Sequence, residues 1–102
     1  IHASDAVRAI EASSRVKEYS VINIGHADFR QIHDLAEMIR VRLDAPKELV
    51  TVRELPSRMT LAKRPTLTRM RDILGVEPKI SLEEGVDRVC RRVQERLDFL
   101  KA

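Results

Sequence analysis

Only two short segments of this chain have the residue pattern of β-strands, and both lie between segments of helical periodicity. Residues 21–24 are apolar, mostly β-branched and followed by Gly25, which predicts a strand buried on both faces. Residues 49–55 alternate apolar and polar side chains, which predicts a second strand with one wet face. Because two strands do not form an independently stable sheet, a third strand or a neighbouring lobe is expected. Ile1-His2 is a candidate for the end of that third strand.

The remaining apolar residues recur at helical spacing, and residues able to cap a helix mark where each pattern begins. Ser4 and Asp28 begin the first two predicted helices, over about residues 4–14 and 28–43. Thr66 begins a short helix that stops at Gly75, and Ser81 begins a final amphipathic helix. The order helix, strand, helix, strand, loop, helix, helix predicts an α/β fold, mainly helical, with a small sheet of two or three short strands.

The composition is that of a folded chain and gives no sign of a membrane segment. Of the 102 residues, 43% are hydrophobic and 34% charged, which fits one small domain or part of a larger one. No apolar run reaches the ~18 residues of a membrane span, and the first residues lack the pattern of a signal peptide. Cys90 is the single cysteine, and its apolar helical neighbours predict a half-buried core residue in a reducing compartment, the cytoplasm.

Basic residues concentrate between Arg53 and Arg71, where six Lys or Arg stand against one acid, Glu54. Arg58, Lys63 and Arg64 fall in the predicted loop of this segment, where binding residues are common. Guanidinium and ammonium groups suit phosphate, so we expect these residues to bind a diphosphate. A solvated basic face is the alternative reading of the same residues.

Residues typical of catalysis or metal binding do not form a motif in this chain. The glycines at 25, 75 and 85 do not form a dinucleotide-binding fingerprint, and no Lys stands four residues after Tyr19. The histidines have no metal-ligand spacing, so neither a catalytic residue nor a metal site is predicted. Asn23 and His26 lie at the end of the first predicted strand, where a polar side chain can face a cleft.

Five segments, in order, resemble the C-terminal third of the extended short-chain dehydrogenase/reductase family, the NAD-dependent nucleotide-sugar epimerases and dehydratases. The most specific is the run from Leu74 to Gly85, Leu-Gly-Val-Glu-Pro-Lys-Ile-Ser-Leu-Glu-Glu-Gly. The others are residues 1–7, 21–25, 34–39 and 63–66. The chain departs from the family pattern at Val76, where Trp is usual, and at Thr66, where Asp is usual.

The resemblance implies that residues 1–102 are the C-terminal nucleotide-sugar-binding lobe of a Rossmann-type enzyme. It also implies that NAD and the catalytic Tyr and Lys belong to an N-terminal lobe that is absent from this chain. The expected function is therefore substrate binding without catalysis by these residues alone, with Lys63 or Arg64 in the place of the family's phosphate-contacting Arg. Neither the sugar nor the choice between epimerase, dehydratase and decarboxylase follows from these residues.

Two other functions fit parts of the sequence. The basic segment suits a small nucleic-acid-binding module, but Tyr19, Phe29 and Phe99 do not interleave with it as a stacking platform would. The amphipathic last helix suits a partner-binding domain without a ligand, and a homodimer is one form of it.

Overall fold

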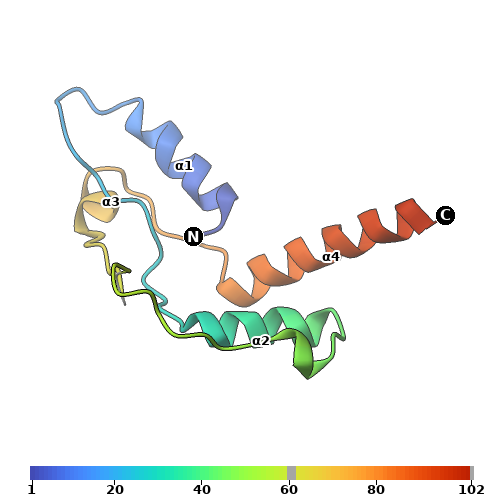
Figure 1. Ribbon diagram of the computed structural model, residues 1–102. Coiled ribbons are helices and arrows are strands. Elements are labelled where there is room, and N and C mark those ends of the chain that lie inside the picture. The colour runs from blue at the N-terminus through green and yellow to red at the C-terminus, as the bar shows by residue number, and fades with distance from the viewer. Residues whose placement is uncertain (60–61, 102) are drawn as a thin grey trace. The chain divides into compact units, whose positions relative to one another are not determined.

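The computed structural model describes residues 1–59 and 62–101, and every regular element among them is a helix (Figure 1). The elements are α1 (Ala3–Ser13), α2 (Ile32–Arg42), the short 3-10 helix η1 (Lys47–Leu49), α3 (Thr68–Asp72) and α4 (Leu82–Lys101). The predicted α/β class, and with it a Rossmann-type lobe containing a sheet, is therefore wrong: no strand occurs in the described residues. The chain forms two compact units, Ile1–Phe29 with Ala62–Leu82, and Arg30–Leu61 with Glu83–Ala102.

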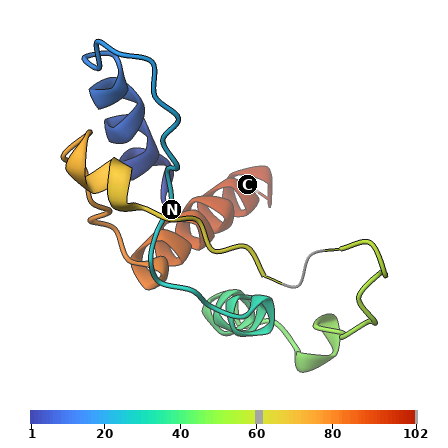
Figure 2. The ribbon, with the colours of Figure 1, turned by 90° about the vertical axis from the view of Figure 1, so that its left-hand side faces the viewer.

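The first unit has a core in which α1 and α3 pack side by side (Figures 1 and 2). Ala9 and Ala12 on α1 meet Met70 of α3 and Val76 beyond it, and all four are buried. The small alanines let α3 approach α1 closely, and the flexible Met70 fills the space between them. Partly buried side chains from the neighbouring segments complete this core: Ile22, Ile24, Leu67 and Leu74.

Residues 21–24 are extended, as the sequence suggested, but they are not a strand buried on both faces. Ile22 and Ile24 pack against the core between α1 and α3, whereas the side chain of Val21 is 61% exposed. Neighbours of this segment are helices and side chains, so its carbonyls find partners other than a strand: the Arg69 guanidinium donates to the carbonyl of Val21. The apolar, β-branched residues of this segment therefore indicate that it packs against a core and do not indicate a strand in a sheet.

The beginnings of the helices differ from the predicted caps. His2 caps α1, because its Nδ1 accepts a hydrogen bond of 3.1 Å from the backbone N–H of Ser4. His2 is therefore not the end of a strand, and Ser4 is not the N-cap of α1, because it lies inside the helix. Leu67 occupies the N-cap position of α3, and Gln31 that of α2, both without a side-chain hydrogen bond, so the predicted Thr66 and Asp28 caps are wrong.

Gly75 ends the α3 segment as predicted. Its φ of 63° lies in the left-handed region that favours glycine. The N–H of Gly75 donates to the Arg71 carbonyl at 3.0 Å, and the N–H of Val76 donates to the Met70 carbonyl at 3.3 Å. The first bond has the pattern of the αL motif, and the second holds Val76 close to α3, where its side chain is buried in the core.

Asp5 is a buried carboxylate that ties α1 to the segment before α4. One oxygen accepts hydrogen bonds from the backbone N–H groups of Lys79, at 3.0 Å, and Ile80, at 2.9 Å. The other pairs with Arg8 at 2.7 Å. The hydrogen bond from Ile80 is the largest influence holding the pKa of Asp5 below its usual value, aided by Lys79 and Arg8 and opposed by burial. Asp5 thus stays ionised, and it organises residues that are distant in sequence.

In the second unit, arginines join α2 and the residues before it to the N-terminal half of α4. Arg42 donates to the Glu83 carbonyl at 3.3 Å and lies 3.7 Å from the Asp87 carboxylate, while Arg30 pairs with Glu83 at 2.6 Å. Val86 and Cys90 are the buried apolar side chains of α4, which agrees with a core position for Cys90.

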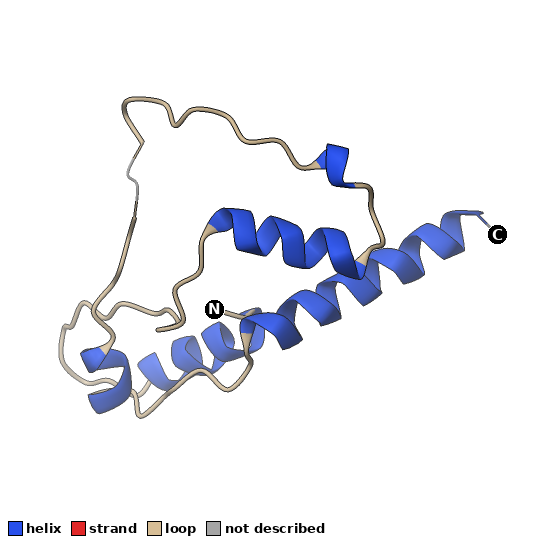
Figure 3. Cartoon of the chain, turned by 90° about the horizontal axis from the view of Figure 1, so that it is seen from below, coloured by secondary structure: helices blue, strands red, loops and turns tan. Residues whose placement is uncertain are grey.

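The second predicted strand, residues 49–55, is also wrong. Leu49 closes the 3-10 helix η1, and the residues after it form an irregular segment, visible as the long tan connection in Figure 3. Side chains 51–59 are all exposed, Val52 to 81%. Alternation alone does not make a strand, because no neighbouring strand is present in the described residues to accept its hydrogen bonds. Residues 60–61 of the predicted loop 56–64 lie outside the described part of the chain.

Candidate functional site

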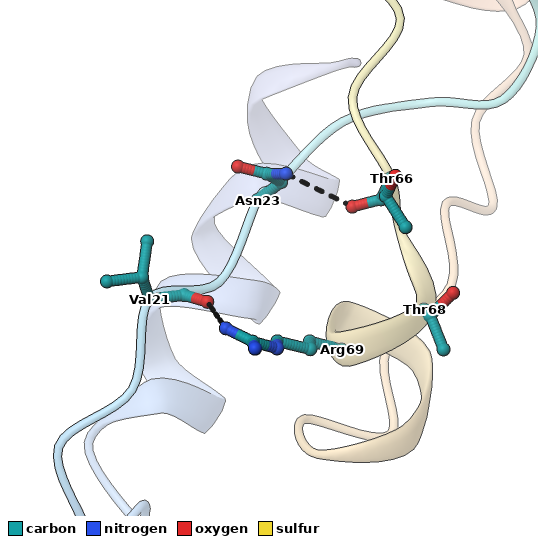
Figure 4. Close-up of a pocket in the computed structure, with 5 residues that line it drawn as sticks. All are labelled: Val21, Asn23, Thr66, Thr68 and Arg69. Carbon is teal, nitrogen blue, oxygen red and sulfur yellow. Dashed lines mark hydrogen bonds between the residues drawn. The ribbon is translucent and has the colours of Figure 1, made fainter.

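A cavity of about 390 Å³ opens in the first unit between the extended residues 21–23 and the start of α3. Two hydrogen bonds bridge these two walls (Figure 4). The Asn23 side-chain amide donates to the Thr66 carbonyl at 3.2 Å, and Arg69 donates from Nη1 to the Val21 carbonyl at 2.9 Å. We call this the Asn23–Thr66 cavity, and its lining consists of Val21, Asn23, Thr66, Thr68 and Arg69.

Four of the five residues that line the Asn23–Thr66 cavity have polar side chains and one of these, Arg69, is cationic, although most of the surface that lines it is apolar. Thr66 and Thr68 line it, with the Thr68 hydroxyl pointing away from Arg69 and Asn23 in Figure 4, and the Asn23 side-chain oxygen points away from Thr66. Arg69 uses one N–H on Val21, and its guanidinium has further donors. Such a set of groups suits a ligand that carries hydroxyls and an anionic group, with no acid in the lining to repel it.

The predicted diphosphate residues occupy three different environments. The Arg64 guanidinium lies over the Phe29 ring, 5.2 Å from its centroid, which orders an otherwise exposed arginine. Lys63 is exposed beside it in the same unit. Arg58 is exposed and belongs to the second unit. Lys63 and Arg64 therefore belong to the same unit as Asn23, and Arg58 belongs to the other unit.

The two residues predicted to face a cleft, Asn23 and His26, have different positions in the structure. Asn23 lines the Asn23–Thr66 cavity. His26 does not; its Nδ1 accepts a hydrogen bond of 2.9 Å from the backbone N–H of Asp28, so it stabilises the turn that leads to Phe29. Arg69 and Thr68 were not predicted as site residues. Arg69 lay within the basic concentration, and that charge was the only signal for it in the sequence.

A second opening of about 540 Å³ in the same unit is lined by Arg8, Arg71, Gly75, Glu77, Pro78 and Lys79. Its arginines are already paired, Arg8 with Asp5 at 2.7 Å and Arg71 with Asp72 at 2.8 Å. The hydrogen bond from Arg71 lowers the pKa of Asp72, so this exposed pair stays charged. Because Glu77 also lines it, this opening is less suited to an anion than the Asn23–Thr66 cavity.

Within residues 1–59 and 62–101, no group of three or more His, Cys, Asp or Glu side chains is placed to hold a metal ion. Nor is any helix of this described part long and apolar enough to cross a membrane. No protein-family model, curated protein or solved structure matches this chain. The Asn23–Thr66 cavity and the five sequence segments therefore supply the argument for function.

Proposed function

We propose that this chain binds a nucleotide sugar as the substrate-binding part of an NAD-dependent epimerase or dehydratase, and does not catalyse the reaction by itself. In this proposal Lys63 and Arg64 neutralise the diphosphate, and the groups of the Asn23–Thr66 cavity bind hydroxyls of the same ligand. The chain's own glycines do not form a dinucleotide-binding loop, so NAD is assigned to no residue here.

The observation that carries the proposal is the hydrogen bond between Asn23 and Thr66, which lie 43 residues apart. Asn23 belongs to segment 21–25 and Thr66 to segment 63–66, two of the five segments in which the chain resembles the epimerase family. Their contact brings both segments to the wall of one cavity. Chance similarity in sequence gives no reason for the two segments to line the same cavity.

The ordering of Arg64 supports a role in binding. A long side chain that is free in solution loses rotamer freedom when it binds phosphate. Contact with the Phe29 ring restricts Arg64 before any ligand is present, so less entropy remains to be lost. An arginine fork also matches two phosphate oxygens at once, which a lysine does not.

A titration with uridine diphosphate, guanosine diphosphate and thymidine diphosphate, followed by amide NMR, tests the proposal. Binding is expected to shift the amides of Asn23, Thr66 and Arg69. The double change Lys63→Ala with Arg64→Ala is expected to weaken binding about 10- to 100-fold, the effect of losing charge-assisted hydrogen bonds. Arg92→Ala is the matched control, because Arg92 is an exposed arginine on α4, and it should leave binding unchanged.

Three results would contradict the proposal. The first is the absence of any shift near Asn23 with every diphosphate. The second is equal weakening by Arg92→Ala, which would indicate attraction to net positive charge. The third is stronger, steeply salt-dependent binding of mixed-sequence DNA, which would favour the nucleic-acid module instead.

A further inference from the structure

The last turns of α4 are not covered by the other described residues of the second unit. Every side chain from 91 to 101 is exposed, whereas Cys90, directly before them, and Val86, about one turn earlier, are buried. Figure 1 shows these last turns diverging from α2 of the same unit, whose Arg42 contacts Glu83 and Asp87 near the start of α4. The exposed half is nevertheless amphipathic.

Apolar residues follow a heptad pattern through both halves of α4. Val86, Cys90, Val93, Leu97 and Leu100 are separated alternately by four and three residues, the spacing of the core positions of a coiled coil. The first two are buried within the unit, but the last three are exposed to 44%, 44% and 67%. The N-terminal half of this apolar stripe is therefore buried within the unit, and its C-terminal half is exposed to solvent.

Several polar side chains of α4 pair with one another within the helix. Arg88 pairs with Glu84 at 2.6 Å, Arg91 pairs with Asp87, and Gln94 donates to Asp98 at 3.2 Å. These pairs are spaced four residues apart and stabilise a helix only modestly. A few helical turns do not persist in water on such pairs alone, so the apolar stripe needs a covering surface.

We infer that the covering surface is α4 of a second copy of this chain, running antiparallel. In this pairing Val93 packs against Leu97 of the second copy, and Leu97 against its Val93. Leu100 then reaches the level of Cys90 on the second copy's helix, next to Val89, which is 59% exposed. Each copy supplies the same stripe to the other, as two-fold symmetry requires.

Charge selects the antiparallel direction. Taking Val93 and Leu97 as core positions of the heptad, Asp87 and Lys101 fall on one flank and Arg96 on the other. Antiparallel helices bring Asp87 near Lys101 of the second copy, twice per dimer, at the cost of one contact between the two Arg96 side chains. Parallel helices would set Arg96 against Lys101, a like-charge contact, twice. A second copy therefore complements the antiparallel stripe in both shape and charge.

Sedimentation equilibrium of the 102-residue chain from about 10 µM to about 1 mM tests the inference. A dimer is expected that dissociates on dilution, because only a short stripe is buried. Leu97→Gln should raise its dissociation constant at least ~10-fold, since each dimer carries the change twice. Leu97 is exposed in the monomer and glutamine favours helix, so this variant should keep the folded units intact. Glu95→Gln introduces the same residue on the opposite face of α4 and should leave the constant unchanged.

The direction of the helices is tested by cross-linking. In the antiparallel pair the two Gln94 side chains share one flank, whereas in a parallel pair they lie on opposite flanks. Gln94→Cys, in a Cys90→Ala background, should therefore form an intermolecular disulfide on mild oxidation. A chain that stays monomeric to about 1 mM, a dimer indifferent to Leu97→Gln, or a dimer in which Gln94→Cys does not cross-link would each overturn the inference.

Discussion

The two units of this chain hold their helices together by different means. In the first unit, Ala9 and Met70 are almost completely buried, and the carboxylate of Asp5 is buried with them and fully bonded. In the second, the described buried apolar side chains are Val86 and Cys90, and two partly exposed arginines, Arg42 of α2 and Arg30 before it, contact α4.

The difference indicates where stability resides. Burial of apolar side chains is the main source of folding free energy, and exposed ion pairs contribute little. The amides around Met70 should therefore exchange hydrogen with solvent more slowly than those around Cys90. The first unit also contains the Asn23–Thr66 cavity, so the proposed ligand site lies on the more stable part of the chain.

The largest expected effect is that of truncating the central core side chain of the first unit. Met70→Ala removes a side chain that is 1% exposed and leaves a cavity between α1 and α3, at a cost of about 2–5 kcal/mol. Hydrogen exchange of Ala9 and Val76 amides measures that loss. Met59→Ala makes the same change at an exposed position of the second unit and should cost less than about 0.5 kcal/mol. Equal losses from the two variants would remove the distinction between the units.

A smaller effect is expected from the buried carboxylate. Asp5→Asn keeps the shape but gives up the charge that two backbone N–H groups and Arg8 require, at a cost of about 1–3 kcal/mol near neutral pH. Urea unfolding followed at a first-unit amide measures the cost. Asp34→Asn, on the exposed side of α2, is the control and should have little effect.

The same carboxylate makes the first unit sensitive to acid. The pKa of Asp5 is lowered in the folded chain, so its stabilisation is complete above the unfolded value of about 4 and is lost as the pH falls through the folded value. The difference in unfolding free energy between the wild type and Asp5→Asn should therefore shrink below about pH 4. A difference that is constant with pH would mean that Asp5 acts through packing and not through its charge.

Helices were predictable from the sequence because their pattern is local. The predicted first helix, 4–14, differs from α1 by one residue at each end, and the amphipathic final helix corresponds to α4. Gly75 was placed correctly because a left-handed backbone at the end of a helix leaves few other choices of residue. These features depend on neighbours within a few residues of each other.

The predicted sheet failed because a strand depends on residues that lie elsewhere. Residues 21–24 have a strand-like composition, yet Ile22 and Ile24 are partly buried against helices and not in a sheet. Asp5 gave no sign of burial, because its partners Lys79 and Ile80 are more than seventy residues away. The contact of Arg64 with Phe29 was also unpredictable, because the two residues are far apart in the sequence. It brings an aromatic ring next to the basic segment, where the sequence showed none. Asn23 was predicted for the cavity, whereas Arg69 is recognisable there only from the fold.

The smallest effect in this comparison is expected where the second unit depends on charge. Arg42→Ala removes the hydrogen bond to the Glu83 carbonyl and the contact with Asp87, which should cost about 0.5–1 kcal/mol because both groups are partly exposed. Hydrogen exchange at Val86 and Cys90 should accelerate, while exchange at Met70 stays the same. Arg92→Ala on the exposed face of α4 is the control.

Added salt should reduce the effect of Arg42→Ala, because screening weakens the exposed ion pair in the wild type. A loss above about 2 kcal/mol, or one that salt does not change, would show that Arg42 supports the unit through packing of its stem, and the contrast with the first unit would narrow.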